Sequence, residues 1–173
     1  MTVTLLANFS YSWSDATSTE KAACIGVVLR NDYAVGVLTN SSIYPTMEIE
    51  VCTWWSPALY RNGSIGNITL NASYELCKQS ASSMDNQTHW PTYVFTANSN
   101  SLGVVDLDLM AFVHHIHQNV ESLTGYYGMG AHFGFRIYTG KGSWGYTAEP
   151  SLNVGVAPVT PVTPVTPVTP VTP

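Results

Sequence analysis

The chain has 173 residues, only 10% of them charged, and its formal net charge is −5 with six lysines and arginines in total. So few cations cannot neutralise many phosphates, which argues against a nucleic-acid-binding protein. No stretch approaches the roughly 20 consecutive apolar residues of a transmembrane helix, so we expect no membrane span.

The first third of the chain predicts long strands. Residues 2–13 alternate between apolar and polar side chains, which indicates a half-buried strand. Two apolar runs, ACIGVVLR and YAVGVLT, then flank Asn31 and Asp32. Because such a pair tolerates the dihedrals of a tight turn, we expect a two-residue hairpin here.

The middle of the chain predicts shorter strands. Residues 46–54 alternate, with Glu48 and Glu50 on the polar side, and residues 67–73 alternate in the same way. A polar loop over residues 78–90 and a short strand, TYVFTA, follow.

One segment has the periodicity of a helix. From residue 106 to residue 124 the apolar side chains recur with i, i+3, i+4, i+7 spacing, which predicts one long amphipathic helix with Phe112 and Ile116 at the centre of its buried stripe. Asp106 is the expected N-cap and Gly125 the expected stop.

The segments after this helix return to strand periodicity. Residues 126–139 alternate, with glycines on one face, and a last strand pair is expected around residues 144–156. These patterns predict a mainly β domain over residues 1–156, either a β-sandwich or an α+β fold.

Residues 157–173 form a separate segment, a Pro-Val-Thr repeat. A proline at every third position fixes φ and removes a backbone donor, so helix and sheet are both disfavoured. We expect an extended, polyproline II-like tail about 50 Å long. Such a tail is either a passive solvated segment, or a spacer or ligand for a partner whose identity the sequence does not give.

The repeat from Pro158 to Pro173, about a tenth of the chain, resembles the threonine-proline-repeat viral proteins of the rod-shaped virus of the archaeon Thermoproteus tenax. This resemblance implies a viral protein of a thermophilic host, with no assigned enzymatic activity and no functional residues to carry over. Because the first residues show no signal-peptide pattern, we expect it in the cytoplasm of the infected cell rather than exported or on the virion surface.

The chain offers candidate residues for metal binding and for a disulfide. His114 and His117, at i and i+3 on one flank of the predicted helix, are the candidate metal ligands. Cys52 and Cys77 are the candidate disulfide, with three buried reduced thiols as the alternative. The sequence shows no catalytic constellation, and we expect no cofactor.

Aromatic residues and glycosylation motifs are the remaining candidates. An aromatic ligand platform would use Trp54, Trp55, Tyr60 and Trp90. Asn-x-Ser/Thr motifs that could carry glycans begin at Asn62, Asn67 and Asn71.

The leading interpretation is a non-enzymatic viral accessory or structural protein, with a β-rich head and a stiff tail for spacing or partner contact. The alternative is a carbohydrate- or surface-binding module that uses its exposed aromatics.

Overall fold

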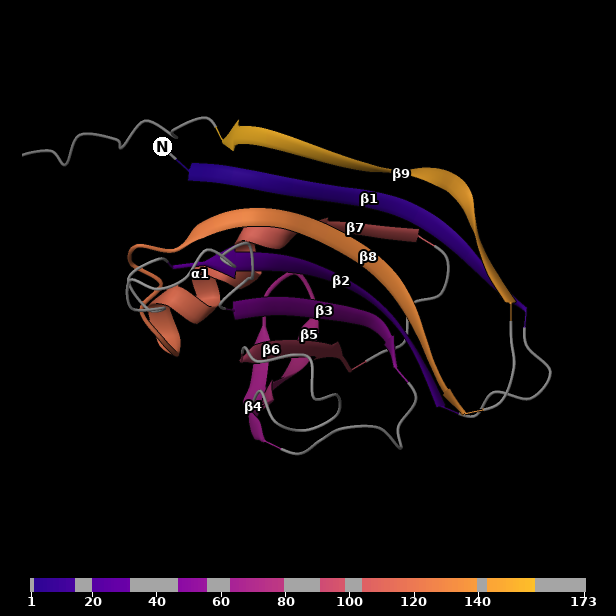
Figure 1. Ribbon diagram of the computed structural model, residues 1–173, viewed down its shortest axis with the longest axis horizontal. Helices are drawn as coiled ribbons and strands as arrows, with labels where there is room; N and C mark the ends of the chain where they lie inside the picture. The colour runs from indigo at the N-terminus through magenta and orange to yellow at the C-terminus, as the bar shows by residue number, and fades with distance from the viewer. Residues whose placement is uncertain are drawn as a thin grey trace, which may run out of the picture.

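The computed structural model describes residues 2–14, 20–31, 47–55, 63–79, 91–98, 104–139 and 143–157. This part of the chain forms nine strands and one helix, arranged as a sandwich of two sheets (Figure 1). The prediction of a mainly β fold is therefore confirmed. The repeat tail lies outside the described residues from position 158 onward, so its extended conformation stays a prediction.

The larger sheet has six strands in the order β4-β5-β6-β3-β2-β8, and of its neighbouring strands only β3 and β6 are parallel. The strands are β2 (Glu20–Arg30), β3 (Met47–Trp55), β4 (Ser64–Thr69), β5 (Ser73–Gln79), β6 (Thr92–Ala97) and β8 (Tyr127–Thr139).

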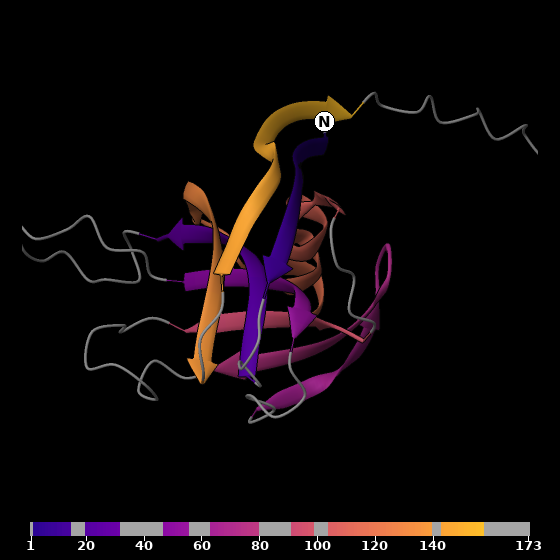
Figure 2. The ribbon, with the colours of Figure 1, turned by 90° about the vertical axis from the view of Figure 1, so that its right-hand side faces the viewer.

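The smaller sheet has β1 (Thr2–Ser14) at its centre, with β7 (Val104–Asp108) and β9 (Ser143–Ala157) antiparallel on either side. Figure 2 shows β1 and β9 side by side. The expected strand pair near the end of the domain is wrong, because β9 is a single strand of 15 residues that pairs with β1.

The helix, α1 (Leu109–Asn119), is shorter than predicted. Strand β7 takes up the residues before it, so Asp108 rather than Asp106 is the N-cap and accepts a hydrogen bond from the Met110 amide at 3.1 Å. The predicted apolar stripe is confirmed, with Phe112 and Ile116 fully buried. Among the described residues, no helix is long and apolar enough to cross a bilayer.

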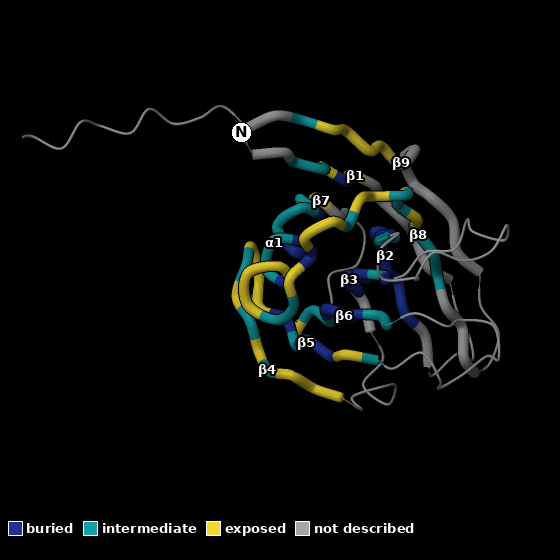
Figure 3. Tube along the Cα trace, turned by 60° about the vertical axis from the view of Figure 1, so that its left-hand side comes forward, coloured by how far each residue is buried: buried dark blue, intermediate teal, exposed yellow. Residues whose placement is uncertain are grey.

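The core lies between one face of the large sheet, the helix and the small sheet. Phe112 of α1 packs edge-on against the rings of Tyr74 and Phe95, with centroids 5.1 and 5.0 Å away. Figure 3 shows buried segments of the large sheet gathered around α1. We call this the core face; its side chains are those of Ile25, Val27, Leu29, Ile49, Val51, Tyr74, Leu76, Tyr93 and Phe95.

One local prediction is wrong and one falls outside the described residues. The run YAVGVLT, expected to form a hairpin with β2, belongs to residues 32–46, which the structure does not describe; the neighbours of β2 in the sheet are β3 and β8. The predicted strand over residues 67–73 is instead the β4–β5 hairpin, in which Thr69 pairs with Ser73.

Candidate functional site

The face of the large sheet opposite the core face carries two carboxylates. In β3, Ile49 and Val51 point into the core, so the pleat directs Glu48 and Glu50 to the other side. Cross-strand register then aligns Glu50 with Gly26 of β2 and His132 of β8 in one row. We call this the carboxylate face, defined by Glu48, Glu50, Gly26 and His132.

His132 reaches across β2 to contact Glu48. Its Nε2 lies 3.1 Å from Glu48 Oε1, an ion pair when the imidazole is protonated. The contact depends on Gly26, because a Cβ built on this residue would lie 2.5 Å from His132 Cε1 and 2.9 Å from Nε2. A glycine in the middle strand therefore leaves the space in which the ring lies.

The three polar side chains differ in exposure. Glu50 is 1% exposed, the side chain of Glu48 is 12% exposed and that of His132 is 42% exposed. One ligand atom from each lies within 4.8 Å of the other two. A pair of carboxylates at this spacing can act as general acid and base, or can bind a cation together with the imidazole.

The same face carries a disulfide, and the predicted Cys52–Cys77 pairing is wrong. Cys52 is bonded to Cys24, which lies opposite it on β2. Cys77 lies on β5, separated from β3 by β6, and is buried outside the disulfide. Strands about 4.8 Å apart place Cys52 within bonding reach of its direct neighbour but not of a residue two strands away.

The structure does not bring the predicted metal ligands into a metal-binding group. His114 and His117 both line a cavity of about 650 Å³ whose other walls are mainly apolar. His117 Nδ1 accepts a hydrogen bond from the Leu123 amide at 2.9 Å, so it satisfies the backbone beyond the helix end. In the described part of the chain, groups of three potential ligands include neither histidine.

The predicted aromatic platform is not tested. Trp54 and Trp55 are adjacent residues of β3, paired with Ala23 and Ala22 of β2. Their side chains, and the residues Tyr60 and Trp90, lie outside the described part.

Two of the three predicted glycosylation sites lie on the surface of the β4–β5 hairpin. Asn67 is exposed on β4, and Asn71 is exposed in the turn, where its Oδ1 accepts a hydrogen bond from the Tyr74 hydroxyl at 2.9 Å. The two asparagines therefore do not lie on one strand. Asn62 lies outside the described residues, and glycosylation itself stays a prediction.

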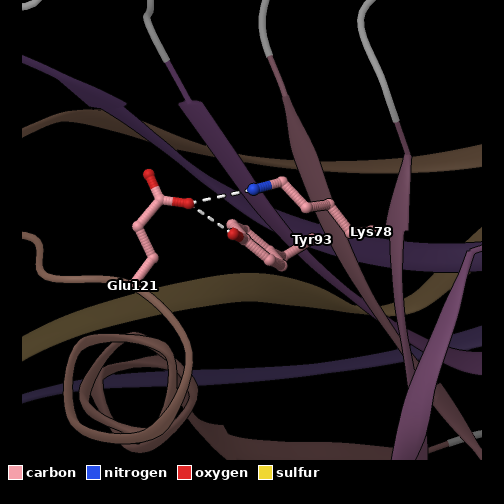
Figure 4. Close-up of polar contacts among 3 residues, drawn as sticks. All are labelled: Lys78, Tyr93 and Glu121. Carbon is pink, nitrogen blue, oxygen red and sulfur yellow. Dashed lines mark hydrogen bonds and ion pairs between the residues drawn. The ribbon is translucent and has the colours of Figure 1, made fainter.

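A second polar cluster joins the large sheet to the segment after α1 (Figure 4). Glu121 Oε2 accepts hydrogen bonds from the Tyr93 hydroxyl and from Lys78 Nζ, the latter at 3.0 Å. The bond from Tyr93, followed by Lys78, lowers the pKa of Glu121. Burial, followed by the bond to Glu121, raises the pKa of Tyr93, and the contacts with Tyr93 and Glu121 raise the pKa of Lys78. All three groups are engaged with one another, so this cluster fastens the fold.

Sequence reasoning missed the carboxylate face. The alternation identifies Glu48 and Glu50 only as the polar side of a strand. The available signal was two glutamates with i, i+2 spacing in a chain of low charge content. The register that places His132 beside them joins residues more than 80 positions apart and has no local signature.

The fold resembles solved glycoside hydrolases of family 12. The family 12 xyloglucanase of Bacillus licheniformis matches with a TM-score of 0.73 at 16% identity, over 88% of this chain and 62% of that one. Endoglucanase 3 of Trichoderma harzianum matches with a TM-score of 0.68 at 15% identity, over 88% and 63%. An endoglucanase of Rhodothermus marinus matches with a TM-score of 0.63 at 18% identity, over 88% and 62%.

The chain thus spans about 62% of the length of the solved structures that it matches. No protein-family model matches the sequence, and no curated protein matches it significantly. At these identities the likeness concerns the fold, which is that of a β-sandwich of the family 12 type.

This likeness corrects the interpretation of the chain as a non-enzymatic viral accessory or structural protein. The structures that match it are glycoside hydrolases, not viral repeat proteins. The interpretation failed because it rested on a tail of about a tenth of the chain, whose repeat carries no information on the chemistry of the head.

Proposed function

We propose that the protein is a carbohydrate-active enzyme that hydrolyses β-linked glucans, with Glu48 and Glu50 as its carboxylate pair. The observation that carries the proposal is the position of these two side chains, together on the carboxylate face of a sandwich whose solved neighbours are xyloglucanases and endoglucanases.

The spacing of the pair supports one type of hydrolysis. Glycosidases that retain anomeric configuration place their two carboxyl groups about 5–5.5 Å apart, whereas inverting enzymes need about 6.5–9.5 Å to admit a water molecule. One oxygen of Glu48 and one of Glu50 lie within 4.8 Å of each other, an approach that is compatible with the shorter separation. One carboxylate would attack the anomeric carbon while the other protonates the leaving oxygen and then activates water.

His132 would orient the pair. Its contact with Glu48 fixes one carboxylate, and its exposed ring faces the side from which a substrate arrives.

The experiment is an assay of reducing ends released from xyloglucan and from β-1,4-glucan by the full chain. Glu48→Gln and Glu50→Gln should each lower the rate at least about 100-fold. Glu75→Gln is the matched control, because Glu75 lies on the same side of the sheet, two strands from β3, and should keep near wild-type activity. A product released first in the β configuration would support retention.

The burial of Glu50 favours one second candidate, a carbohydrate-binding module without hydrolysis. In that case the same polymers would retard the protein in affinity electrophoresis, and neither glutamine variant would change a rate, because none would be measured. Hydrolysis that survives both substitutions would contradict the proposed catalytic pair.

A further inference from the structure

The carboxylate face has the donor set of a metal site. His132 offers an imidazole nitrogen, and Glu48 and Glu50 offer carboxylate oxygens, a combination that suits zinc and related divalent transition metals. We infer that these three side chains bind one such ion.

The distances fit coordination of a single ion. Zinc holds nitrogen and oxygen ligands at about 2.0–2.2 Å, so two ligand atoms in a tetrahedral arrangement lie about 3.4 Å apart. His132 Nε2 and Glu48 Oε1 are 3.1 Å apart already. The Glu50 oxygen, within 4.8 Å of both, needs a shift of at most about 1.5 Å, which rotation of its side chain supplies.

The backbone holds the ligands in register. Glu48 and Glu50 come from one strand, and His132 comes from the second strand away, with Gly26 between them. Because a Cβ at position 26 would overlap the imidazole, this glycine is a condition of the three-ligand arrangement. Ligands on paired strands are better fixed than ligands on loops.

Charge and exposure point the same way. Two carboxylates, one of them 1% exposed, lie beside one imidazole on this face. A divalent cation at this position would add positive charge next to both carboxylates. His132 on the exposed side gives the ion its entry path and leaves a coordination position for water.

The site consists of the residues assigned to hydrolysis, so one consequence rests on the proposed function: the ion and the substrate exclude each other. Zinc should then inhibit hydrolysis, and a chelator should restore it. Binding of the ion requires no activity and is measured by itself.

The test is calorimetric titration of the chelator-treated full chain with Zn²⁺ alone. We expect one ion per chain, with affinity reduced at least about 10-fold in Glu50→Gln and in His132→Asn. The matched control is His114→Asn/His117→Asn, which removes the imidazoles of the apolar cavity and should bind as the wild type does. Circular dichroism of each variant shows whether it is folded.

A second measurement covers variants that fail to fold. Co²⁺ added to the wild-type chain should give the visible absorption of a four-coordinate nitrogen and oxygen site, and Zn²⁺ should displace it. Absence of binding, or binding lost only in the His114/His117 control, overturns the inference. Zinc binding by a chain that hydrolyses neither polymer even in the presence of a chelator supports the site and contradicts the proposed function, whereas hydrolysis without zinc binding does the reverse.

Discussion

The two faces of the large sheet place different chemistry on the same strands. On the core face, alternate residues of β2, β3, β5 and β6 are apolar and pack against α1, with Phe112 set between two rings. On the carboxylate face, the intervening residues of β2 and β3 meet His132 of β8 in a polar cluster. A strand of period two lets one face stabilise the fold while the other holds reactive groups.

The comparison teaches where substitutions should act. On the core face, the free energy of unfolding should depend on the volume and burial of the apolar side chains. On the carboxylate face, the position of the His132 imidazole should depend on the space left by the missing side chain of Gly26. Substitutions on each face, and at the cluster that joins the large sheet to the segment after α1, test this division.

The largest expected effect is at Phe112 of α1, which packs against the core face. Phe112→Ala removes a ring that is 1% exposed and leaves a cavity between Tyr74 and Phe95, so it should lower the free energy of unfolding by about 3–5 kcal/mol, as measured by urea denaturation. His115→Ala on the same helix is the control, because this half-buried ring only approaches Phe95 at 6.1 Å. Equal costs for both would contradict the assignment of the core face.

A smaller effect is expected beneath His132. Gly26→Ala would place a methyl group 2.5 Å from the imidazole, so His132 must move, at a cost of about 1–3 kcal/mol. The same change should weaken zinc binding and hydrolysis together, since both use this contact. Titration and the reducing-end assay measure these losses.

Gly134→Ala is the matched control for this substitution, because a Cβ there meets no atom within 4 Å. Replacing a strand glycine without steric conflict should be neutral or stabilise the fold by up to about 1 kcal/mol. If Gly26→Ala behaved in the same way, the ring would not depend on the glycine, and the division between the faces would lose its main support.

Local sequence patterns predicted which residues of α1 and β1 are buried. The stripe of α1 that contains Phe112 and Ile116 follows helical periodicity, and the alternation of β1 correctly separates buried Ala7 from exposed Leu6 and Asn8. Such periodic patterns depend only on residues that are close in sequence, so a single sequence is enough to predict them.

The carboxylate face could not be predicted in this way, because it depends on the order of strands. The disulfide partner of Cys52 was wrong for the same reason: which strand lies beside β3 is decided by packing over long separations. The error in the helix start was smaller. It arose because Asp106 and Asp108 are both suitable caps, and the pairing of β7 with β1 selects the second.

The smallest expected effect concerns the cluster that joins the large sheet to the segment after α1. Glu121→Gln removes the charge that accepts hydrogen bonds from Tyr93 and Lys78. Because Glu121 and Lys78 are 35% and 45% exposed, solvent screens their interaction, and the loss at pH 7 should stay below about 1 kcal/mol.

The pH dependence of this loss gives it a signature. The pKa of Glu121 is lowered in the folded protein, so its contribution is present above the ordinary glutamate value near 4.5 and disappears as the pH falls through the lowered folded value. The difference in unfolding free energy between wild type and Glu121→Gln should therefore shrink as the pH falls below the ordinary glutamate value near 4.5. A constant difference would show that the two hydrogen bonds do not hold the carboxylate charged.

Lys78→Met separates the two partners of Glu121. The bond from Tyr93 is the largest cause of the lowered pKa, so this variant should keep most of the acid-side dependence. The smaller part that Lys78 contributes in the wild type should weaken in high salt. The raised pKa values of Tyr93 and Lys78 act at the other end of the scale: their contributions are complete below about pH 10 and are lost above it, outside the acid range of this measurement. If Lys78→Met abolished the acid-side dependence, the exposed ion pair rather than the partly buried Tyr93 hydroxyl would join the sheet to the segment after α1.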